Sequence, residues 1–305
     1  MTWAPSSLAE ALDDVLARPP EPVPATVFDH LRHHLESSAR EAATMANLGI
    51  DAGPLRLPKR RIEELLGCER RALANLHAGT RLSPELVVGT LLDLLTTYHV
   101  LGGTPPADPF RVATDLLDAK AEDDEDAADT LAWLWSQPVQ VQDQIAATAA
   151  DRYHSLTSGW PALTGWNPRM GETATAVLAD GDVIVSGRID ITIGGGWCNR
   201  PLVVVEVKSG KSWRDHRADH HLYALLLGLR DDAAPAAVIT CTAGDGALAP
   251  DLVDEDTLTR AAKRTSHAIR IAGELAGHLR APATNPGPLC EHCADNARCP
   301  AVRNG

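Results

Sequence analysis

Hydrophobic residues form their clearest pattern between residues 182 and 227. Valine fills four of the five positions from 203 to 207, and β-branched runs of this kind favour buried strands. An apolar stretch at 182–193 precedes this run, and three glycines at 194–196 lie between the two. These features predict two antiparallel strands joined by a glycine turn. The leucine-rich stretch that ends at Leu227 predicts a helix directly behind them.

Helical periodicity is found in most of the remaining chain. Ser83 is a good N-cap for a strongly apolar helix, and Phe28, Leu31 and Leu35 share one face of an N-terminal helix. The segments with the strongest helical pattern are 54–76 (one helix or two short ones), 83–101, 129–158 and 254–280. Further strands are expected on both sides of a turn at 179–182 and at 236–243. This pattern predicts an α/β fold with a mixed central sheet flanked by helices.

Charge and composition narrow the class of protein. The chain of 305 residues has a net charge of −13, which argues against nucleic-acid binding over the whole surface but leaves room for a local basic channel. It has no stretch of about 18 apolar residues and no basic-then-apolar N-terminus, so we expect a cytoplasmic protein without a membrane span. In that compartment the six cysteines are expected to be metal ligands or free thiols rather than disulfides.

Two charged residues, Glu206 and Lys208, stand in the valine run. Residues two apart on a strand point to the same face, so these side chains are expected to lie side by side, with Asp190 of the preceding strand close to Glu206. Burying such charges is costly unless they are paired or bind a metal. Two carboxylates and an amine suit metal-assisted phosphodiester hydrolysis. The alternative is a structural Glu–Lys pair beside an unrelated aspartate.

The array Asp190…Glu206-Val207-Lys208 resembles the D…(D/E)xK core of the PD-(D/E)XK nuclease superfamily. This resemblance implies an α/β nuclease core in which Asp190, Glu206 and the Val207 carbonyl bind Mg²⁺ or Mn²⁺. Lys208 would orient or activate the attacking water. Residues 55–305 would form the nuclease domain, and residues 1–54 a helical N-terminal extension.

The following stretch RADHHLYALLL resembles the QxxxY helix of the RecB-type exonuclease branch. Tyr223 falls on the tyrosine of this motif and would steady the site or the DNA backbone, whereas Asp219 stands where the branch has glutamine. The stretch from Gly89 to Asp93 resembles a GxxxH helix with aspartate at the histidine position. The resemblance implies that Asp93 is a further metal ligand, and oxygen ligands suit Mg²⁺.

Three cysteines near the C-terminus, Cys290, Cys293 and Cys299, form a C-x₂-C-x₅-C array. By spacing alone they are part of a zinc site completed by His292 or a distant residue, or free thiols in a tail. The segment GCERRAL resembles the CPRRxxL segment of iron–sulfur RecB-type nucleases, with Glu69 where proline is usual, so Cys68 falls on their distant fourth cysteine. These nucleases include CRISPR-adaptation nucleases, AddB-type subunits and exonuclease V. The resemblance implies a [4Fe–4S] cluster that ties the tail to the N-terminal part of the domain.

These resemblances lead to one main hypothesis. We expect a metal-dependent deoxyribonuclease, an exonuclease acting on single-stranded or end-containing DNA in repair, recombination or defence. The alternative is an inactive nuclease-fold subunit that binds DNA or acts as a scaffold in a helicase–nuclease complex. The chain has no GxxxxGK[ST] motif, so ATP-driven unwinding would require a helicase partner.

Overall fold

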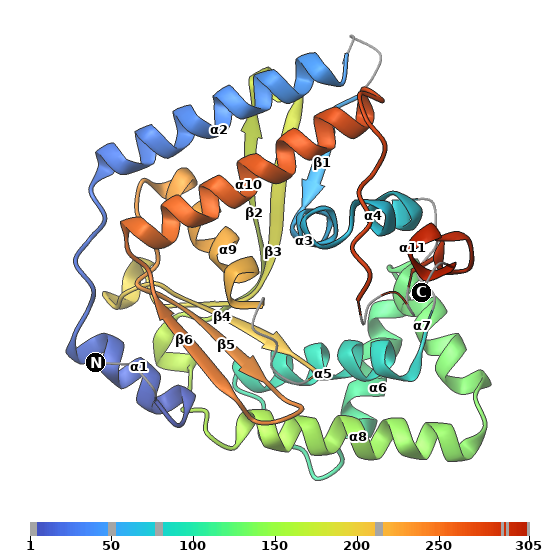
Figure 1. Cartoon of the computed structure of the whole chain (residues 1–305). Helices are drawn as coiled ribbons and strands as arrows, with labels where there is room; N and C mark the ends of the chain where they lie inside the picture. The colour runs from blue at the N-terminus through green and yellow to red at the C-terminus, as the bar shows by residue number, and fades with distance from the viewer. Residues whose placement is uncertain are drawn as a thin grey trace.

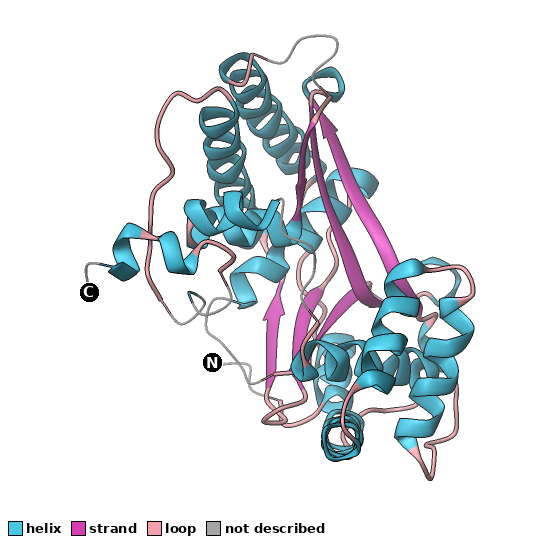
Figure 2. Cartoon of the chain, turned by 90° about the vertical axis from the view of Figure 1, so that its right-hand side faces the viewer, coloured by secondary structure: helices cyan, strands magenta, loops and turns pink. Residues whose placement is uncertain are grey.

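A six-stranded mixed sheet runs through the protein, and helices cover both of its faces (Figures 1 and 2). The computed structural model describes residues 5–47, 53–76, 82–210, 216–287, 290 and 293–303. The strand order is β1-β3-β4-β5-β6, and β2 pairs with β3 as well. The sheet and its flanking helices confirm the predicted α/β class. The strands are β1 (Leu55–Pro58), β2 (Arg169–Leu178), β3 (Val183–Ile193), β4 (Val203–Lys208), β5 (Ala237–Thr242) and β6 (Leu248–Leu252).

Helices make up most of the remaining described residues. In the N-terminal half they are α1 (Leu8–Ala17), α2 (Ala25–Met45), α3 (Lys59–Gly67), α4 (Glu69–Leu76), α5 (Pro84–Val100), α6 (Pro109–Ala121), α7 (Glu125–Ser136) and α8 (Val139–Thr157). In the C-terminal half they are α9 (His216–Asp231), α10 (Glu255–Ala276) and the short α11 (Pro300–Arg303). No helix among the described residues is long and apolar enough to cross a membrane.

Strand β3 splits the sheet into a fork. Most of its length, between 183 and 192, pairs antiparallel with β2, whereas its other edge pairs first with β1 at 183–186 and then with β4 at 191–193. The β3–β4 pairing confirms the predicted antiparallel strands. Between these two contacts, residues 187–190 have no strand partner on that edge within the described sheet. This gap receives side chains from α9 and lies beside the predicted site.

Two hydrophobic cores lie on opposite faces of the sheet. The first joins α2, α3, α9 and α10 to the sheet, and the second joins α1 and α5–α8 to the other face. Strand β4 contributes to both, because Val204 faces the first core and Val203, Val205 and Val207 face the second. The four valines of the run are therefore explained by a strand buried on two sides.

Two local predictions needed correction. The segment 129–158 was expected to be one helix, but it forms α7 and α8, and Pro138 precedes the second helix as its N-cap. Proline removes a backbone donor and disfavours helical conformation in the residue before it. The segment 54–76 contains two short helices, as one of its alternatives predicted, but the four residues of β1 precede them. A strand this short, ending in proline, gives little signal by itself.

Helix α2 packs along α10, and the two lie side by side in both overall views (Figures 1 and 2). Small residues allow their backbones to approach closely. A Cβ atom built on Gly273 of α10 would lie 2.7 Å from both the Cα atom and the carbonyl oxygen of Ala42 on α2. Phe28, Leu31 and Leu35 of α2 are buried in the same core. The division into a 1–54 extension and a 55–305 domain remains a prediction.

Replacing Gly273 with alanine tests this helix contact. We expect Gly273→Ala to lower the urea midpoint of unfolding, because overpacking against backbone costs about 1–3 kcal/mol. This cost exceeds the roughly 1 kcal/mol by which alanine is favoured over glycine in a helix. The matched control is Gly165→Ala, where a new Cβ would meet nothing within 4 Å. Equal midpoints for the two variants would contradict the close approach.

Candidate active site

Asp190 lies in the fork of the sheet, at the end of residues 187–190, whose edge towards β1 and β4 has no strand partner in the described sheet (the unpaired part of β3). Its Oδ2 atom accepts a hydrogen bond from the backbone N–H of Val207 at 2.8 Å. This contact joins the aspartate directly to the Glu206-Val207-Lys208 segment across the point where β3 and β4 diverge. The structure therefore brings the predicted aspartate and the ExK segment together.

Glu206 is the most enclosed charged group of the site, with 2% of its surface exposed. Four groups surround its Oε1 atom, and the heavy-atom distances are 2.7 Å to Lys208 Nζ, 3.3 Å to Lys59 Nζ, 3.4 Å to Tyr223 Oη and 3.5 Å to His220 Nε2. The contact with Lys208 shows that the two side chains share a face, as predicted for residues two apart on a strand. The other oxygen, Oε2, is buried and has no hydrogen-bond partner among the described residues.

The carboxylates of the site repel one another. Burial raises the pKa of Asp190 to about 8, and the negative charges of Glu206 and Asp93 contribute to this rise. Burial also acts to raise the pKa of Glu206, but the charges of Lys208 and Lys59 outweigh it and lower that pKa below its usual value. The charge of Glu206 in turn raises the pKa of Lys208 against the opposing effect of burial. Glu206 is thus held ionised by two lysines.

Tyr223 closes the fork from the side of α9. Its hydroxyl donates a hydrogen bond to the backbone carbonyl of Arg188 at 2.8 Å. Gly187 leaves room for the ring, since a Cβ atom there would lie 2.7 Å from Cε1 of Tyr223. The glycine of the SGRID segment is therefore explained by the close approach of this tyrosine to the unpaired part of β3.

Asp93 reaches the site from α5, on the opposite side of the sheet from α9. Its side chain remains accessible to solvent. Loss of solvation raises its pKa to about 6, opposed by the charge of Lys208 and reinforced by that of Glu206. The role of Asp93 as a ligand remains a prediction.

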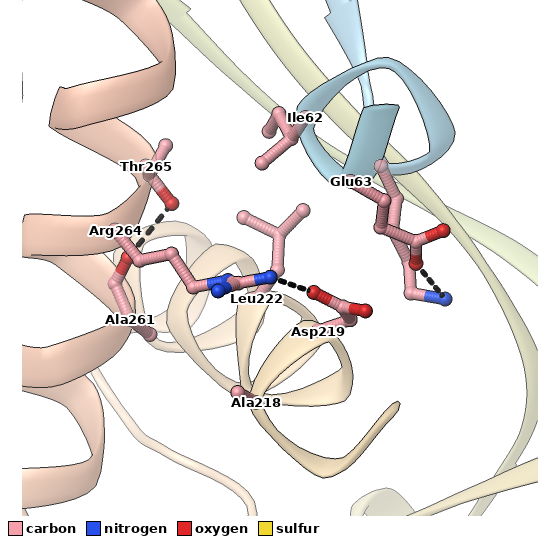
Figure 3. Close-up of a pocket in the computed structure, with 9 residues that line it drawn as sticks. Ile62, Glu63, Ala218, Asp219, Leu222, Ala261, Arg264 and Thr265 are labelled. Carbon is pink, nitrogen blue, oxygen red and sulfur yellow. Dashed lines mark hydrogen bonds and ion pairs between the residues drawn. The ribbon is translucent and has the colours of Figure 1, made fainter. Parts of the chain in front are cut away.

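Asp219 stands at the glutamine position of the QxxxY pattern. Among the described residues it makes no hydrogen bond or ion pair with Glu206. It forms an ion pair with Arg264 of α10, and the two line a small cavity between α3, α9 and α10 (Figure 3). Burial and the charge of Glu63 raise the pKa of Asp219 to about 6, and Arg264 opposes them. The substitution of aspartate for glutamine is therefore matched by a cation from another helix.

Two site residues were missed by sequence reasoning, Lys59 and His220. His220 is completely buried, its Nδ1 atom lies 2.6 Å from Thr240 Oγ1, and its ring stacks on that of Tyr223. A buried polar residue on the apolar face of α9 was the available signal. The sequence did not single out Lys59, because it is followed directly by Arg60 and Arg61 in a basic segment where a lysine is not unusual.

The chemistry of these oxygens fits a hard divalent cation. The carboxyl groups of Asp190, which is half-buried, and Glu206, which is fully buried, repel each other, and Glu206 Oε2 has no hydrogen-bond partner among the described residues. A bound cation would relieve both conditions. The acidic side chains nevertheless do not form a complete set of metal ligands among the described residues. Across the described part of the chain, no three His, Cys, Asp or Glu side chains are grouped so that they could hold a metal ion.

The same finding applies to the predicted cluster of Cys68, Cys290, Cys293 and Cys299. All four are free thiols, and their sulfurs are not grouped as a metal site among the described residues, so the structure does not confirm a four-sulfur centre. The structure does bring the tail to Cys68. The backbone N–H of Asn285 lies 3.5 Å from Cys68 Sγ, and Asn285 also donates to the Gly67 carbonyl. His292, the alternative zinc ligand, lies outside the described residues.

Ion pairs hold this tail against α4. Arg70 of α4 pairs with Asp295 at 2.6 Å, and Arg280 donates to Glu69 at 2.8 Å. The N–H of Ala283 donates to the Glu69 carboxylate at 2.7 Å. Glu69, which occupies the position where the resembled nucleases have proline, is thus part of the contact between α4 and the tail.

A family model matches most of the chain. The model of the PD-(D/E)XK nuclease superfamily matches residues 59–300. The chain is also similar to the crystal structure of SSO0001, with 16% identity, a TM-score of 0.32, and coverage of 71% of this chain and 97% of that one. It is similar to the structure named "Putative exonuclease" from Eubacterium rectale, with 12% identity, a TM-score of 0.43, and coverage of 82% and 88%. A comparison with curated proteins found no match. Because the family match spans most of the chain and includes β3, β4 and α9, the protein belongs to the PD-(D/E)XK nuclease superfamily.

Proposed function

We propose that this protein is a Mg²⁺- or Mn²⁺-dependent nuclease that hydrolyses DNA phosphodiester bonds. The observation that carries the proposal is the buried Glu206 carboxylate, in which one oxygen is surrounded by donors and the other has no partner in the described part of the chain. A structural Glu–Lys pair would not require a second carboxylate, Asp190, hydrogen-bonded to the intervening residue. Membership of the nuclease superfamily supports the same reaction class.

Each residue has a part in this proposal. Asp190 and Glu206 would hold the cation with Asp93 and the Val207 carbonyl, and the cation would polarise the phosphate and lower the pKa of a bound water. Lys208, whose side chain is 27% exposed, is accessible enough to orient that water. Tyr223 binds the β3 backbone and Glu206, so its part is to keep the fork open and the carboxylate in place.

For the substrate, we propose DNA that is single-stranded or has a free end, as in the RecB-type exonuclease branch. The QxxxY-like helix α9 supports this assignment, because it carries Tyr223 into the site. The processes we propose are repair, recombination or defence, with a helicase or another subunit as partner.

A second candidate is a nuclease fold that binds DNA or serves as a scaffold without cleaving it. The observation in its favour is that Glu206 Oε1 is already surrounded by donors, while the described carboxylates are not grouped as a metal site. Metal binding separates the two candidates. An inactive module would show no Mn²⁺ binding that depends on Asp190.

Replacing Glu206 with glutamine tests the main proposal. Glu206→Gln keeps the shape of the side chain but removes its charge, so cleavage of end-labelled DNA with Mn²⁺ should fall by roughly 100-fold or more. Lys208→Met should have a similar effect on cleavage. Glu41→Gln, at an exposed position on α2, is the matched control and should cleave like the wild type. Wild-type activity in both site variants, with circular dichroism showing an intact fold, would refute the assignment.

We further propose that Cys68, Cys290, Cys293 and Cys299 bind a [4Fe–4S] cluster, with zinc as the alternative. The support is the route of the tail, which passes Cys68 at Asn285. The tail is held to α4 by Ala283 before that point and by Asp295 after it. Thiolate ligation would add folding free energy to this docking. The ion pairs between α4 and the tail do not depend on a metal, and binding of the four thiolates to a metal centre would strengthen the same contact.

Metal analysis after anaerobic purification tests this second proposal. The wild type should contain iron and acid-labile sulfide and absorb visible light, whereas Cys293→Ser should lose the absorption and melt at a lower temperature. Cys241→Ser is the control, because Cys241 is buried in β5, away from the tail. Stoichiometric zinc in place of iron would favour the alternative, and a metal-free wild-type protein would refute both.

A further inference from the structure

Lys59 is a buried cation at the first position of α3, with 9% of its surface exposed. Its ammonium group lies 2.8 Å from Oε1 of Glu63 and 3.3 Å from Oε1 of Glu206. It also lies over the ring of Tyr223, 5.2 Å from the ring centroid. A buried lysine is costly unless its charge is compensated. The positive charge of Lys59 is compensated by Glu206, which belongs to the proposed site, and by Glu63, which lies outside it.

The fold determines where this ammonium group lies. β1 runs parallel to the first part of β3, and α3 begins immediately after β1 at Lys59. The side chain therefore starts at the end of the strand that borders the fork. Glu63 is one helical turn further along α3, on the same face, so it holds Lys59 from its own helix.

A second ion pair lies behind Lys59. Figure 3 shows Arg264 reaching from α10 to Asp219 of α9, with Glu63 across the same small cavity. Each carboxylate there has its own cation: Asp219 has Arg264, and Glu63 has Lys59. Among the contacts of the described residues, Lys59 thus links this group of charges to Glu206.

We propose that Lys59 is a positioning residue of the nuclease site, which holds Oε1 of Glu206 so that Oε2 stays directed to the divalent cation. This inference rests on the proposed function. Lys208 also contacts Oε1, but it is partly exposed and extends from the same strand as Glu206, two residues away. Lys59 approaches from a different element and is itself fixed by Glu63. It therefore restrains the carboxylate independently of the lysine that would act on water.

This role has a consequence that distinguishes it from a general contribution to folding. Removing the charge of Lys59 leaves the carboxylates more negative, so a cation should bind at least as tightly as before. At the same time Glu206 loses a restraint, and misplacement of a ligand lowers turnover. The two effects have opposite signs. A loss of structure would weaken cation binding and turnover together.

The test is Lys59→Met, measured in two ways. Mn²⁺ binding is followed by electron paramagnetic resonance without DNA, and single-turnover cleavage of end-labelled DNA is followed at saturating Mn²⁺. We expect the dissociation constant for Mn²⁺ to stay equal or fall, and the cleavage rate to fall by roughly 10-fold or more. Lys59→Arg, which keeps the charge, should recover part of the lost rate.

Two further variants make the result interpretable. Lys263→Met, at an exposed position of α10, is the matched control and should change neither quantity. Lys59→Met/Glu63→Gln removes both charges of the Lys59–Glu63 pair, so it answers the question if Lys59→Met alone fails to fold. The double variant should show the same combination of retained Mn²⁺ binding and slower cleavage.

The outcomes separate this inference from the proposed function. Unchanged cleavage in a folded Lys59 variant, with an active wild type, would overturn the positioning role and leave the nuclease assignment intact. Weaker Mn²⁺ binding together with slower cleavage would also overturn it, in favour of a purely structural lysine. A wild type that neither binds Mn²⁺ nor cleaves DNA would overturn the proposed function, and this inference with it.

Discussion

The burial of the Glu206 carboxylate between two lysines is the interaction on which the rest of the site depends. An ionised carboxylate with 2% exposure is tolerated only when nearby charges and donors replace its hydration. Lys208 comes from the same strand, Lys59 from α3, and His220 and Tyr223 from α9. Strand β4 and helices α3 and α9 must therefore pack together correctly before this carboxylate can be buried. The requirement ties the chemistry of the site to the correct assembly of the domain.

The fork in the sheet provides the space for this arrangement. Because β3 leaves β1 after Ser186 and reaches β4 only at Ile191, its backbone between them can bind side chains instead of a strand. Tyr223 uses the carbonyl of Arg188, and Asp190 turns to the N–H of Val207. An unpaired strand edge is normally a liability. Here the Arg188 carbonyl on that edge accepts a hydrogen bond from Tyr223 of the site itself.

The departures from the resembled family motifs are compensated locally. Asp219 replaces glutamine and is neutralised by Arg264, and Glu69 replaces proline and binds Arg280 and the N–H of Ala283. Each substitution is thus matched by a partner that the motif does not contain. Both partners come from the region of α10 and the chain that follows it. That region covers the first core, packs against α2, and continues into the tail that docks on α4.

The sequence by itself determined the elements and much of the site. The valine run with Glu206 and Lys208 predicted a buried strand with two charged groups on one face, because side chains alternate along a strand. The glycine turn placed β3 antiparallel to β4, and the RADHHLYALLL stretch located α9 with Tyr223. Only the tertiary structure decided which distant residues join them. Lys59 is 147 positions from Glu206 and is carried to it by the parallel pairing of β1 with β3, a long-range contact for which periodicity holds no information. The cysteines, which are not grouped as a metal site among the described residues, have the same explanation: spacing defines a set of possible ligands, but whether their sulfurs meet depends on how the tail packs.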